Sequence, residues 1–285
     1  MTLRFLLARP WLWARLAQKA VQGGGAATLR FLLLHDVSSE ERPAFEAAVA
    51  WLAQRNRLAT PAEAQAILAG APFTGDKVVL TFDDGFAGNL DLAETVLARH
   101  GAKAIFFVCP GLMDLEPTAQ RAAIAANIFN GRRQPDALPP QCRLMTWAEL
   151  ERLASLGHEI ANHTLSHRRL STLGADEQEA EIAGGAEMLR QRLGSAGDWF
   201  AFPFGEVASV STETIHSVAR HHKFCRSGVR GGNDAKTHPL ALWADHLDLM
   251  APWAYQRLIL EGGLDRLYQG PRDVLSRLTG ERHGG

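Results

Sequence analysis

The sequence predicts an α/β protein built from parallel strand–helix units, and three observations support this prediction. Short apolar runs such as Leu29–Leu34 and residues 78–82 lack polar alternation, which is typical of strands buried on both faces. Helical patterns lie between these runs at the spacing of βαβ units. The 285 residues are 46% hydrophobic and 21% charged, which allows one large α/β domain or two small ones.

Charge and cysteine content exclude several classes of function. The net charge is −1 and the isoelectric point is about 6.8, so no nucleic-acid partner is expected. The three cysteines are far apart and form no C-x-x-C pair. They are therefore expected to be reduced, buried thiols, and neither a disulfide framework nor a thiolate metal site is predicted.

Residues 1–22 are basic, since no Asp or Glu precedes Asp36. Their apolar run, residues 5–8, ends at Arg9 and is too short for a signal peptide or a membrane span, so a cytoplasmic location is expected. A helix is expected from Pro10 onward, and two interpretations of it stay open. The favoured one packs it on the protein's own core, and the other lays it on a membrane surface as a peripheral contact.

The remaining elements follow in chain order. Glycines 23–25 indicate a hinge after the first helix. Strands are expected over residues 29–34, 78–82, 104–108, 158–162, 200–202 and 223–227. Helices are expected over residues 45–54, 62–68, 89–100, 147–157, 176–193, 212–221 and 254–278. Residues 112–143 interrupt this rhythm and are expected to form a surface insertion with one short helix near residues 121–128.

Two adjacent carboxylates end the second strand. Asp83 and Asp84 follow residues 78–82 and precede Gly85, which permits a tight turn. One interpretation is a turn in which an aspartate caps the next helix. The other places both carboxylates at the carboxyl edge of a parallel sheet, where α/β proteins bind ligands.

A histidine pair follows the fourth strand in the same way. His163 and His167 are spaced H-x-x-x-H, which lets two imidazoles converge. Two histidines and one carboxylate form a typical open zinc site, although two unrelated surface histidines are the alternative. In a parallel barrel the aspartates and histidines would share one rim, together with the turn at Pro203 and Phe204.

These motifs resemble one known family. Residues 29–249 resemble the polysaccharide deacetylase (NodB-homology) family. Three motifs carry the resemblance: Thr81-Phe82-Asp83-Asp84-Gly85, His163-Thr164-Leu165-Ser166-His167 and Phe202-Pro203-Phe204-Gly205. The resemblance implies a single-domain, distorted (β/α) barrel and a metal-dependent amide hydrolase of N-acetylated sugars, often within a polymer. The expected organisation is an N-terminal extension over residues 1–28, the catalytic domain over residues 29–250 and a helical tail over residues 251–285.

The resemblance also implies roles for individual residues. Asp84, His163 and His167 would bind a divalent metal, usually zinc, and Asp83 would be the general base that deprotonates water. The backbone N–H of Phe204, in the turn that begins at Pro203, would stabilise the oxyanion. His35, at the end of the first strand, is expected to line the site, and a structural hydrogen bond with the neighbouring Asp36 is the alternative.

The chain departs from the family pattern at two points. Ala201 stands where the third motif often has an arginine that orients the base, so the group that holds Asp83 is open. The last motif supplies a histidine as general acid in the pattern L-x-x-H. The sequence here is Leu242-Trp-Ala-Asp-His246, one residue longer. His246 beside Asp245 and Asp248 is the candidate acid, and a structural or solvent-facing histidine is the alternative.

Three functions remain open on the sequence. The first is a zinc-dependent deacetylase of an N-acetylated sugar or glycan intermediate. The second is a carbohydrate-binding pseudoenzyme that has lost the orienting arginine and the acid. The third is a deacylase or deformylase of a lipid-linked amino sugar, for which the basic, Trp-bearing N-terminus is the motivation.

Overall fold

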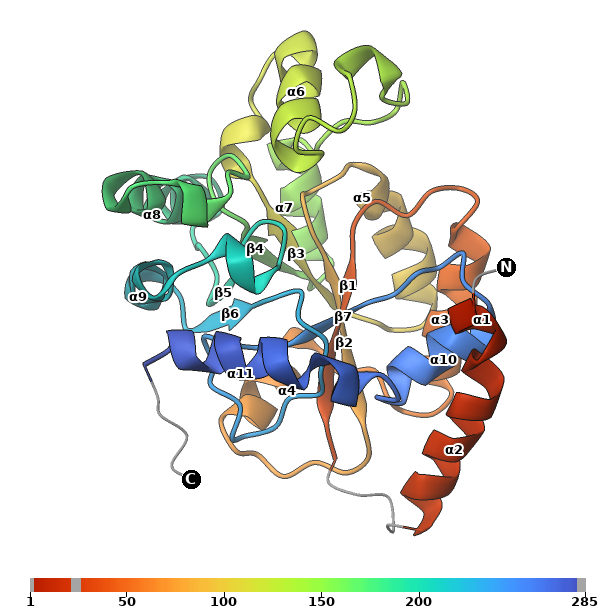
Figure 1. Cartoon of the computed structure of the whole chain (residues 1–285). Coiled ribbons are helices and arrows are strands. Elements are labelled where there is room, and N and C mark those ends of the chain that lie inside the picture. Colours follow the sequence, from red (N-terminus) through yellow and green to blue (C-terminus); the bar gives the residue numbers. More distant parts are fainter. Residues whose placement is uncertain (1–2, 22–26, 281–285) are drawn as a thin grey trace.

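A single parallel sheet organises the molecule (Figure 1). The computed structural model describes residues 3–21 and 27–280. Its seven strands lie in the order β6-β5-β4-β3-β2-β1-β7, and all neighbours run parallel. Their bounds are β1 Leu29–Leu34, β2 Lys77–Phe82, β3 Ala104–Val108, β4 Glu159–Asn162, β5 Trp199–Ala201, β6 Phe224–Arg226 and β7 Ala244–His246. The predicted α/β barrel is confirmed, and all six predicted strands are present.

One segment nearly closes the sheet into a barrel. Strand β7 pairs with β1, and Leu242, two residues before β7, pairs with Arg226 at the end of β6. The sequence analysis did not predict β7. Its three residues include Asp245, whose carboxylate is buried against the Arg30 guanidinium at 2.7 Å. A buried charge is tolerated only when it is paired, and the sequence pattern does not reveal that pairing.

Side-chain alternation separates the inside of the barrel from the outside. Neighbouring residues of a strand point to opposite faces, so every second residue points inward. The interior is filled by Leu29, Phe31, Leu33, Val79, Ile105, Phe107, Ala161, Trp199, Ala201, Leu242 and Ala244. The residues that continue this alternation past the strand ends point into the mouth of the barrel.

The helices surround the sheet (Figure 1). They are α1 Leu3–Leu6, α2 Ala8–Val21, α3 Arg42–Ala53, α4 Pro61–Leu68, α5 Gly88–Leu92, α6 Pro117–Ala123, α7 Trp147–Ser155, α8 Ala175–Leu193, α9 Thr212–His221, α10 Trp253–Leu260 and α11 Gln269–Leu278. The predicted helix over residues 89–100 is α5 continued by a π-helical turn, Ala93–Leu97. The predicted helical tail is two helices, because the chain turns at Gly262, whose φ is 70°.

The insertion after β3 has a small apolar core of its own. Helix α6 continues into a π-helical turn, Ile124–Ile128. The cluster that holds this region together consists of Phe86, Cys109, Leu112, Ile124, Ala125, Leu138, Cys142 and Leu144. Phe86, which follows β2, and Cys109, which follows β3, belong to this cluster. The cluster therefore fastens the insertion to the carboxyl edge of the sheet.

Helix α2 packs on the main core through Ala8 and Leu12, as the favoured interpretation of the N-terminal segment expects. It lies against α10 (Figure 1). The glycine hinge predicted at residues 23–25 lies outside the described residues. Among the helices of residues 3–21 and 27–280, none has the length and apolar character needed to cross a membrane. All three cysteines are free and buried, as predicted.

Candidate active site

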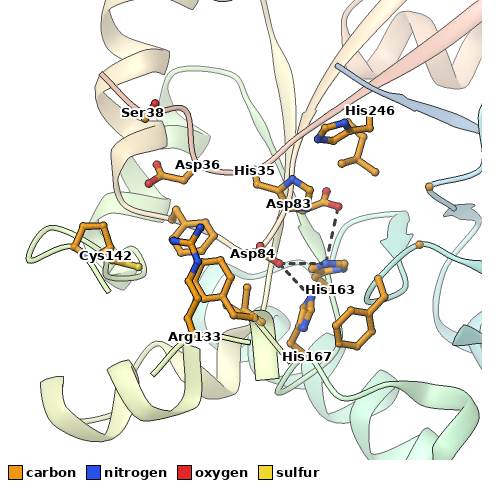
Figure 2. A pocket seen from close by; sticks show the side chains of 18 of the residues that line it. His35, Asp36, Ser38, Asp83, Asp84, Arg133, Cys142, His163, His167 and His246 are labelled. Atoms are coloured by element: carbon orange, nitrogen blue, oxygen red, sulfur yellow. Dashed lines mark ion pairs between the residues drawn. The ribbon is translucent and has the colours of Figure 1, made fainter. Parts of the chain in front are cut away.

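A cavity of about 700 Å³ opens at the carboxyl edge of the sheet. Its walls come from the ends of β1, β2, β4 and β7, from the turn after β5 and from the insertion. Figure 2 shows Asp83, Asp84, His163 and His167 together on one side. The lining includes His35, Asp36, Asp83, Asp84, Phe86, Phe129, Arg133, Cys142, His163, His167, Phe204, Gly205, Gly228 and His246.

Three of these residues form a compact cluster that can hold a metal ion. One ligand atom each of Asp84, His163 and His167 lies within 4.8 Å of the others, and all three residues are buried. Asp84 Oδ1 is 3.5 Å from His163 Nε2 and 3.2 Å from His167 Nε2. The structure thus brings together the three residues that the sequence nominated as ligands.

Hydrogen bonds at the far side of each imidazole orient the cluster. His163 Nδ1 donates to Ala201 O at 2.6 Å, and His167 Nδ1 donates to Asn127 O at 3.0 Å. In a neutral imidazole the other nitrogen, Nε2, then carries a lone pair, which is the arrangement of metal-binding histidines. Asp84 Oδ1 is buried without a hydrogen-bond partner. Three lone-pair donors facing one another in a buried place fit a divalent cation.

The charge on Asp84 agrees with this arrangement. Burial raises the pKa of the Asp84 carboxyl, but His163 and His167 lower it further than burial raises it. The pKa of Asp84 therefore lies well below its usual range, and the group is a carboxylate at neutral pH.

The backbone of the site is strained. Six described residues other than glycine have a positive φ, and four of them belong to the motifs: Asp84 at 74°, Thr164 at 67°, His167 at 62° and Phe204 at 66°. The other two are asparagines, which tolerate this region of φ/ψ space. Asp and His are enriched in this region as well, so the strain falls mainly on Thr164 and Phe204, at a cost of about 1–3 kcal/mol each that surrounding contacts must offset. Such strain is common where a protein aims functional groups.

Arg226 holds the second aspartate. Its Nη2 lies 2.5 Å from both carboxylate oxygens of Asp83, and both residues are buried. The guanidinium also donates to Ser227 O at 3.1 Å and stacks over the Phe107 ring, 4.8 Å from its centroid. Asp83 Oδ2 lies 4.0 Å from His163 Nε2, next to the cluster. Asp83 is thus held in a fixed position beside the cluster of Asp84, His163 and His167.

Sequence reasoning missed Arg226, although a signal was present. Arg226 ends the predicted strand 223–227, and a charged residue at the carboxyl end of a buried strand is a candidate site residue. In the sheet Arg226 lies directly opposite Ala201, the position where the third motif often has its arginine. The guanidinium therefore reaches Asp83 from the adjacent strand, and the small Ala201 side chain leaves space for it.

His246 and His35 form the wall on the other side of Asp83 (Figure 2). Their ring centroids are 6.1 Å apart. Burial, with the charges of His35 and Arg230, lowers the pKa of His246, so its neutral form is favoured. The carboxylate of Asp245, which the sequence offered as a partner of this imidazole, pairs with Arg30 at 2.7 Å.

The turn after β5 contributes Phe204 and Gly205 to the lining, whereas Pro203 does not line the cavity. The Phe204 ring packs edge-on against His167 with centroids 4.9 Å apart, and the Arg169 guanidinium lies 4.3 Å from the Phe204 centroid. This turn therefore fixes one side of the cluster.

The insertion, expected to be a surface feature, builds another wall. Its residues Ile128, Phe129, Arg133, Pro139, Gln141 and Cys142 line the cavity. It also supplies the carbonyl of Asn127 that orients His167, and Asn127 Nδ2 donates to Ser166 O at 2.8 Å. The insertion is thus part of the site.

Comparisons with known proteins bear on this site. Residues 70–224, more than half of the chain, match the family model described as polysaccharide deacetylase. The Bacillus subtilis protein YxkH, which carries a provisional polysaccharide deacetylase name, is 26% identical over 201 residues, covering 68% of this chain and 62% of YxkH. A peptidoglycan-N-acetylglucosamine deacetylase of Bacillus cereus is 28% identical over 139 residues, covering 48% of this chain and 39% of that protein. The chain thus spans less than two thirds of the length of either relative.

Solved structures share the fold. The Streptococcus pyogenes deacetylase PplD, solved with acetate, superposes with a TM-score of 0.64 at 19% identity, over 81% of this chain and 97% of PplD. IcaB from Ammonifex degensii superposes with a TM-score of 0.58 at 19% identity, over 81% of this chain and 98% of IcaB. At this identity the likeness concerns the fold alone.

Proposed function

The chain belongs to the polysaccharide deacetylase family, and from this premise we propose that it hydrolyses the N-acetyl amide of an amino sugar in a polysaccharide or glycan intermediate. The observation that carries the proposal is the geometry around Asp83. The Asp83 carboxyl group, fixed by Arg226, lies beside three converging ligand atoms in a cavity large enough for a sugar.

We propose Asp84, His163 and His167 as ligands of a divalent cation, Zn²⁺, since two imidazoles and one carboxylate form a common open zinc site. Two observations support this assignment. Asp84 Oδ1 has no hydrogen-bond partner, and the Nδ1 atoms of both histidines bond to backbone oxygens, which leaves each Nε2 available to a metal. Such an ion supplies Lewis acidity, which polarises an amide carbonyl and acidifies water beside it.

Asp83 is the proposed general base. Arg226 holds both of its oxygens in place, and Oδ2 lies 4.0 Å from His163 Nε2, so the carboxylate can accept a proton from water that attacks the acetyl carbonyl. The backbone N–H of Phe204 is proposed to stabilise the developing oxyanion.

His246 is proposed to protonate the leaving amine. It lines the same cavity as Asp83 and lies on the far side from the ligands (Figure 2). Burial, with the charges of His35 and Arg230, lowers the pKa of His246, so a proton on its ring is readily given to the leaving amine. His35, with a ring centroid 6.1 Å away, is in position to contact the same part of the substrate.

A specific observation favours a lipid-linked amino sugar as the second candidate substrate. An apolar groove of about 590 Å³ adjoins the cavity, and Phe204, Gly205 and Gly228 line both. Its other lining residues are Glu206, Val207, Ala208, Val229, Tyr268, Pro271 and Val274, of which only Glu206 and Tyr268 carry polar side-chain groups. A sugar needs more hydrogen-bonding partners than these two side chains offer, whereas an aliphatic chain needs none. The reaction would then be removal of an acetyl or a formyl group from a sugar held in the cavity.

Acyl release from defined substrates tests these proposals. The full chain, loaded with Zn²⁺, is expected to release acetate from N-acetylglucosamine oligomers, to lose this activity on chelation and to regain it when Zn²⁺ is restored. Asp83→Asn is expected to keep its bound zinc and to lose about 10²–10⁴-fold in kcat. Asp114→Asn, which changes an exposed carboxylate, serves as the matched control and is expected to retain full activity.

The other outcomes separate the alternatives. Formate or acetate release from a lipid-linked amino sugar, without release from soluble oligomers, would select the second substrate. If the zinc-loaded protein binds glycans but releases no acid from any member of a broad panel, it is a carbohydrate-binding protein and the proposed hydrolysis is wrong.

A further inference from the structure

Two of the three charged side chains of helix α2, Arg15 and Lys19, point toward the protein, opposite to the usual arrangement of a surface helix. Lys19 Nζ lies 2.5 Å from Asp76 Oδ2 and 2.7 Å from Glu261 Oε2. Arg15 Nε donates to the backbone oxygen of Glu261 at 2.9 Å. A helix on the surface of a globular protein normally turns its apolar stripe inward and its charges to water. Here the basic side chains Arg15 and Lys19 instead attach α2 to the rest of the protein.

The opposite side of α2 is consequently apolar. The residues at helical spacing on this side are all exposed, and we name them the outer α2 face: Arg9, Pro10, Trp13, Ala14, Ala17, Ala20 and Val21. Trp13 is 73% exposed and Val21 is 88% exposed. Arg9 is the one charged member of the face.

Neighbouring segments extend this apolar surface. Leu6, Leu7 and Trp11 are exposed beside the outer α2 face, at 55%, 47% and 42%. The segment between β7 and α10 adds Met250, 64% exposed, and α10 adds Trp253, 38% exposed. Contacts of Arg4 with Asp248 and of Phe5 with Tyr255 fasten α1 to this part of the chain. Of the ten large apolar side chains exposed within residues 3–21 and 27–280, these account for seven.

We propose that the outer α2 face, with Leu6, Leu7 and Met250, docks on the surface of an anionic membrane. Tryptophan is enriched at the boundary between lipid and water, where its ring lies among the headgroups. The exposed Arg9 lies among the apolar residues, Arg4 lies near them as the partner of Asp248, and the sequence has no acid before Asp36. Each cation near an anionic leaflet strengthens binding by about 1 kcal/mol.

Charge argues against a second copy of the chain as the occupant. A two-fold dimer through this face would bring the same basic, acid-free segment of each copy together, since such an interface uses one patch twice. Because Arg9 is the one charged member of the face, it would find no counter-charge on the same face of a second copy, whereas an anionic leaflet supplies one. Charge complementarity thus selects the lipid surface.

The geometry connects this face to the reaction cavity. His246 lines the cavity, and the chain reaches the exposed Met250 only four positions later. Asp248, between them, pairs with Arg4 of α1 at 3.6 Å. In Figure 1, α1 lies beside the segment that joins β7 to α10. A docked molecule would therefore hold one wall of its cavity close to the membrane surface.

Vesicle co-sedimentation of the full chain tests the proposal without depending on the proposed chemistry. The protein is expected to bind vesicles of phosphatidylcholine with phosphatidylglycerol, and to bind pure phosphatidylcholine vesicles more weakly. Trp13→Glu is expected to weaken binding at least tenfold. It removes a large apolar surface that the membrane would bury, and it adds a negative charge that the anionic lipids repel. Arg9→Gln is expected to weaken binding about fivefold on the anionic vesicles and to leave binding to phosphatidylcholine unchanged.

Leu267→Glu is the matched control for Trp13→Glu. It introduces the same charge at a residue 62% exposed on another surface, and binding is expected to stay within about twofold of the wild type. The melting temperature and hydrolysis of a soluble substrate should be unchanged in all three variants, which separates docking from folding and from catalysis.

Two results would overturn the proposal. One is absence of wild-type binding to anionic vesicles, or equal binding by Trp13→Glu and Leu267→Glu. The other is a wild-type protein that does not bind vesicles and is a dimer in light scattering, and that Trp13→Glu converts to a monomer. The outer α2 face would then be the contact between two copies of the chain.

Discussion

At the scale of single residues, the pairing of Asp83 with Arg226 is the feature that most affects the chemistry. The third motif lacks its usual arginine, and Ala201 occupies that position. Arg226 stands opposite Ala201 on the neighbouring strand and places its guanidinium on the same carboxylate. The loss of the motif residue is thus offset by a residue outside the motif.

Replacement of Arg226 should therefore impair catalysis without removing the ligand cluster. Arg226→Met is expected to lower kcat about 10- to 100-fold with unchanged zinc content, because Asp83 loses its orienting partner. Arg226→Lys should recover part of the activity, since it restores the charge without the planar geometry. Steady-state kinetics and zinc analysis measure both effects.

Arg192→Met is the control for this substitution. Arg192 forms an exposed pair with Asp114, and its loss should leave kcat unchanged. Wild-type kcat in a folded Arg226→Met protein would show that Asp83 needs no such partner.

His158 makes stability depend on pH. Burial, with the charge of Lys103, lowers the pKa of His158 from 6.5 to about 4. Its Nδ1 accepts the backbone N–H of Ala104, so the folded state needs the neutral ring. Between pH 6.5 and pH 4 the unfolded chain binds a proton that the folded chain excludes, and stability therefore falls as the pH falls through this range.

His158→Asn should reduce this acid sensitivity, because its amide oxygen accepts the same hydrogen bond and does not titrate in this range. Urea unfolding at pH 7 and pH 5 should show a smaller difference in the free energy of unfolding than in the wild type. An unchanged difference would assign the acid sensitivity to other groups.

At the scale of elements, the insertion has a larger part than the sequence analysis expected. It interrupts the strand–helix rhythm with polar, proline-containing sequence, which is typical of surface loops. Its own apolar cluster instead fixes it over the cavity, where it lines a wall and orients His167. The sequence shows the interruption but not the face of the barrel on which it folds back.

Asn127 offers a test of this role. Asn127→Ala removes the bond from Nδ2 to Ser166 O and loosens the backbone whose carbonyl orients His167. Zinc affinity is expected to fall about tenfold, as it does when support behind a metal-binding imidazole is lost. Competition with a chromogenic chelator measures this.

Gln134→Ala provides the comparison, since Gln134 is an exposed residue of the same insertion. Equal zinc affinity of the Asn127→Ala and Gln134→Ala variants would place the insertion outside the metal site.

At the scale of the whole molecule, a buried ion-pair group fastens the segment that closes the barrel. Arg30 of β1 lies 2.7 Å from Asp245 of β7 and 2.5 Å from Asp265 beyond α10. Arg30 and Asp245 are almost completely buried. The group joins the first strand, the last strand and the C-terminal helices, and so sets the position of His246.

Loss of Arg30 from this buried group should lower the free energy of unfolding far more than loss of an exposed ion pair. Arg30→Met leaves the Asp245 carboxylate buried and without its closest cation, and is expected to lower the free energy of unfolding by about 3–5 kcal/mol. Arg152→Met breaks an exposed pair with Glu94 and should cost at most about 1 kcal/mol. Urea denaturation of both variants decides this, and similar costs would contradict the closing role.

The sequence by itself determined the strands, their parallel arrangement and the nomination of Asp83, Asp84, His163 and His167. Apolar runs, turn glycines and motif spacing are local signals, and neighbouring strand ends necessarily share one edge. Only the tertiary structure decided which arginine reaches Asp83, because the two residues are 143 positions apart and meet through strand register. It also decided the closure by β7, the wall built by the insertion and the positive φ angles at the site. These depend on packing between distant segments, which offsets the local cost of buried charge and of backbone strain.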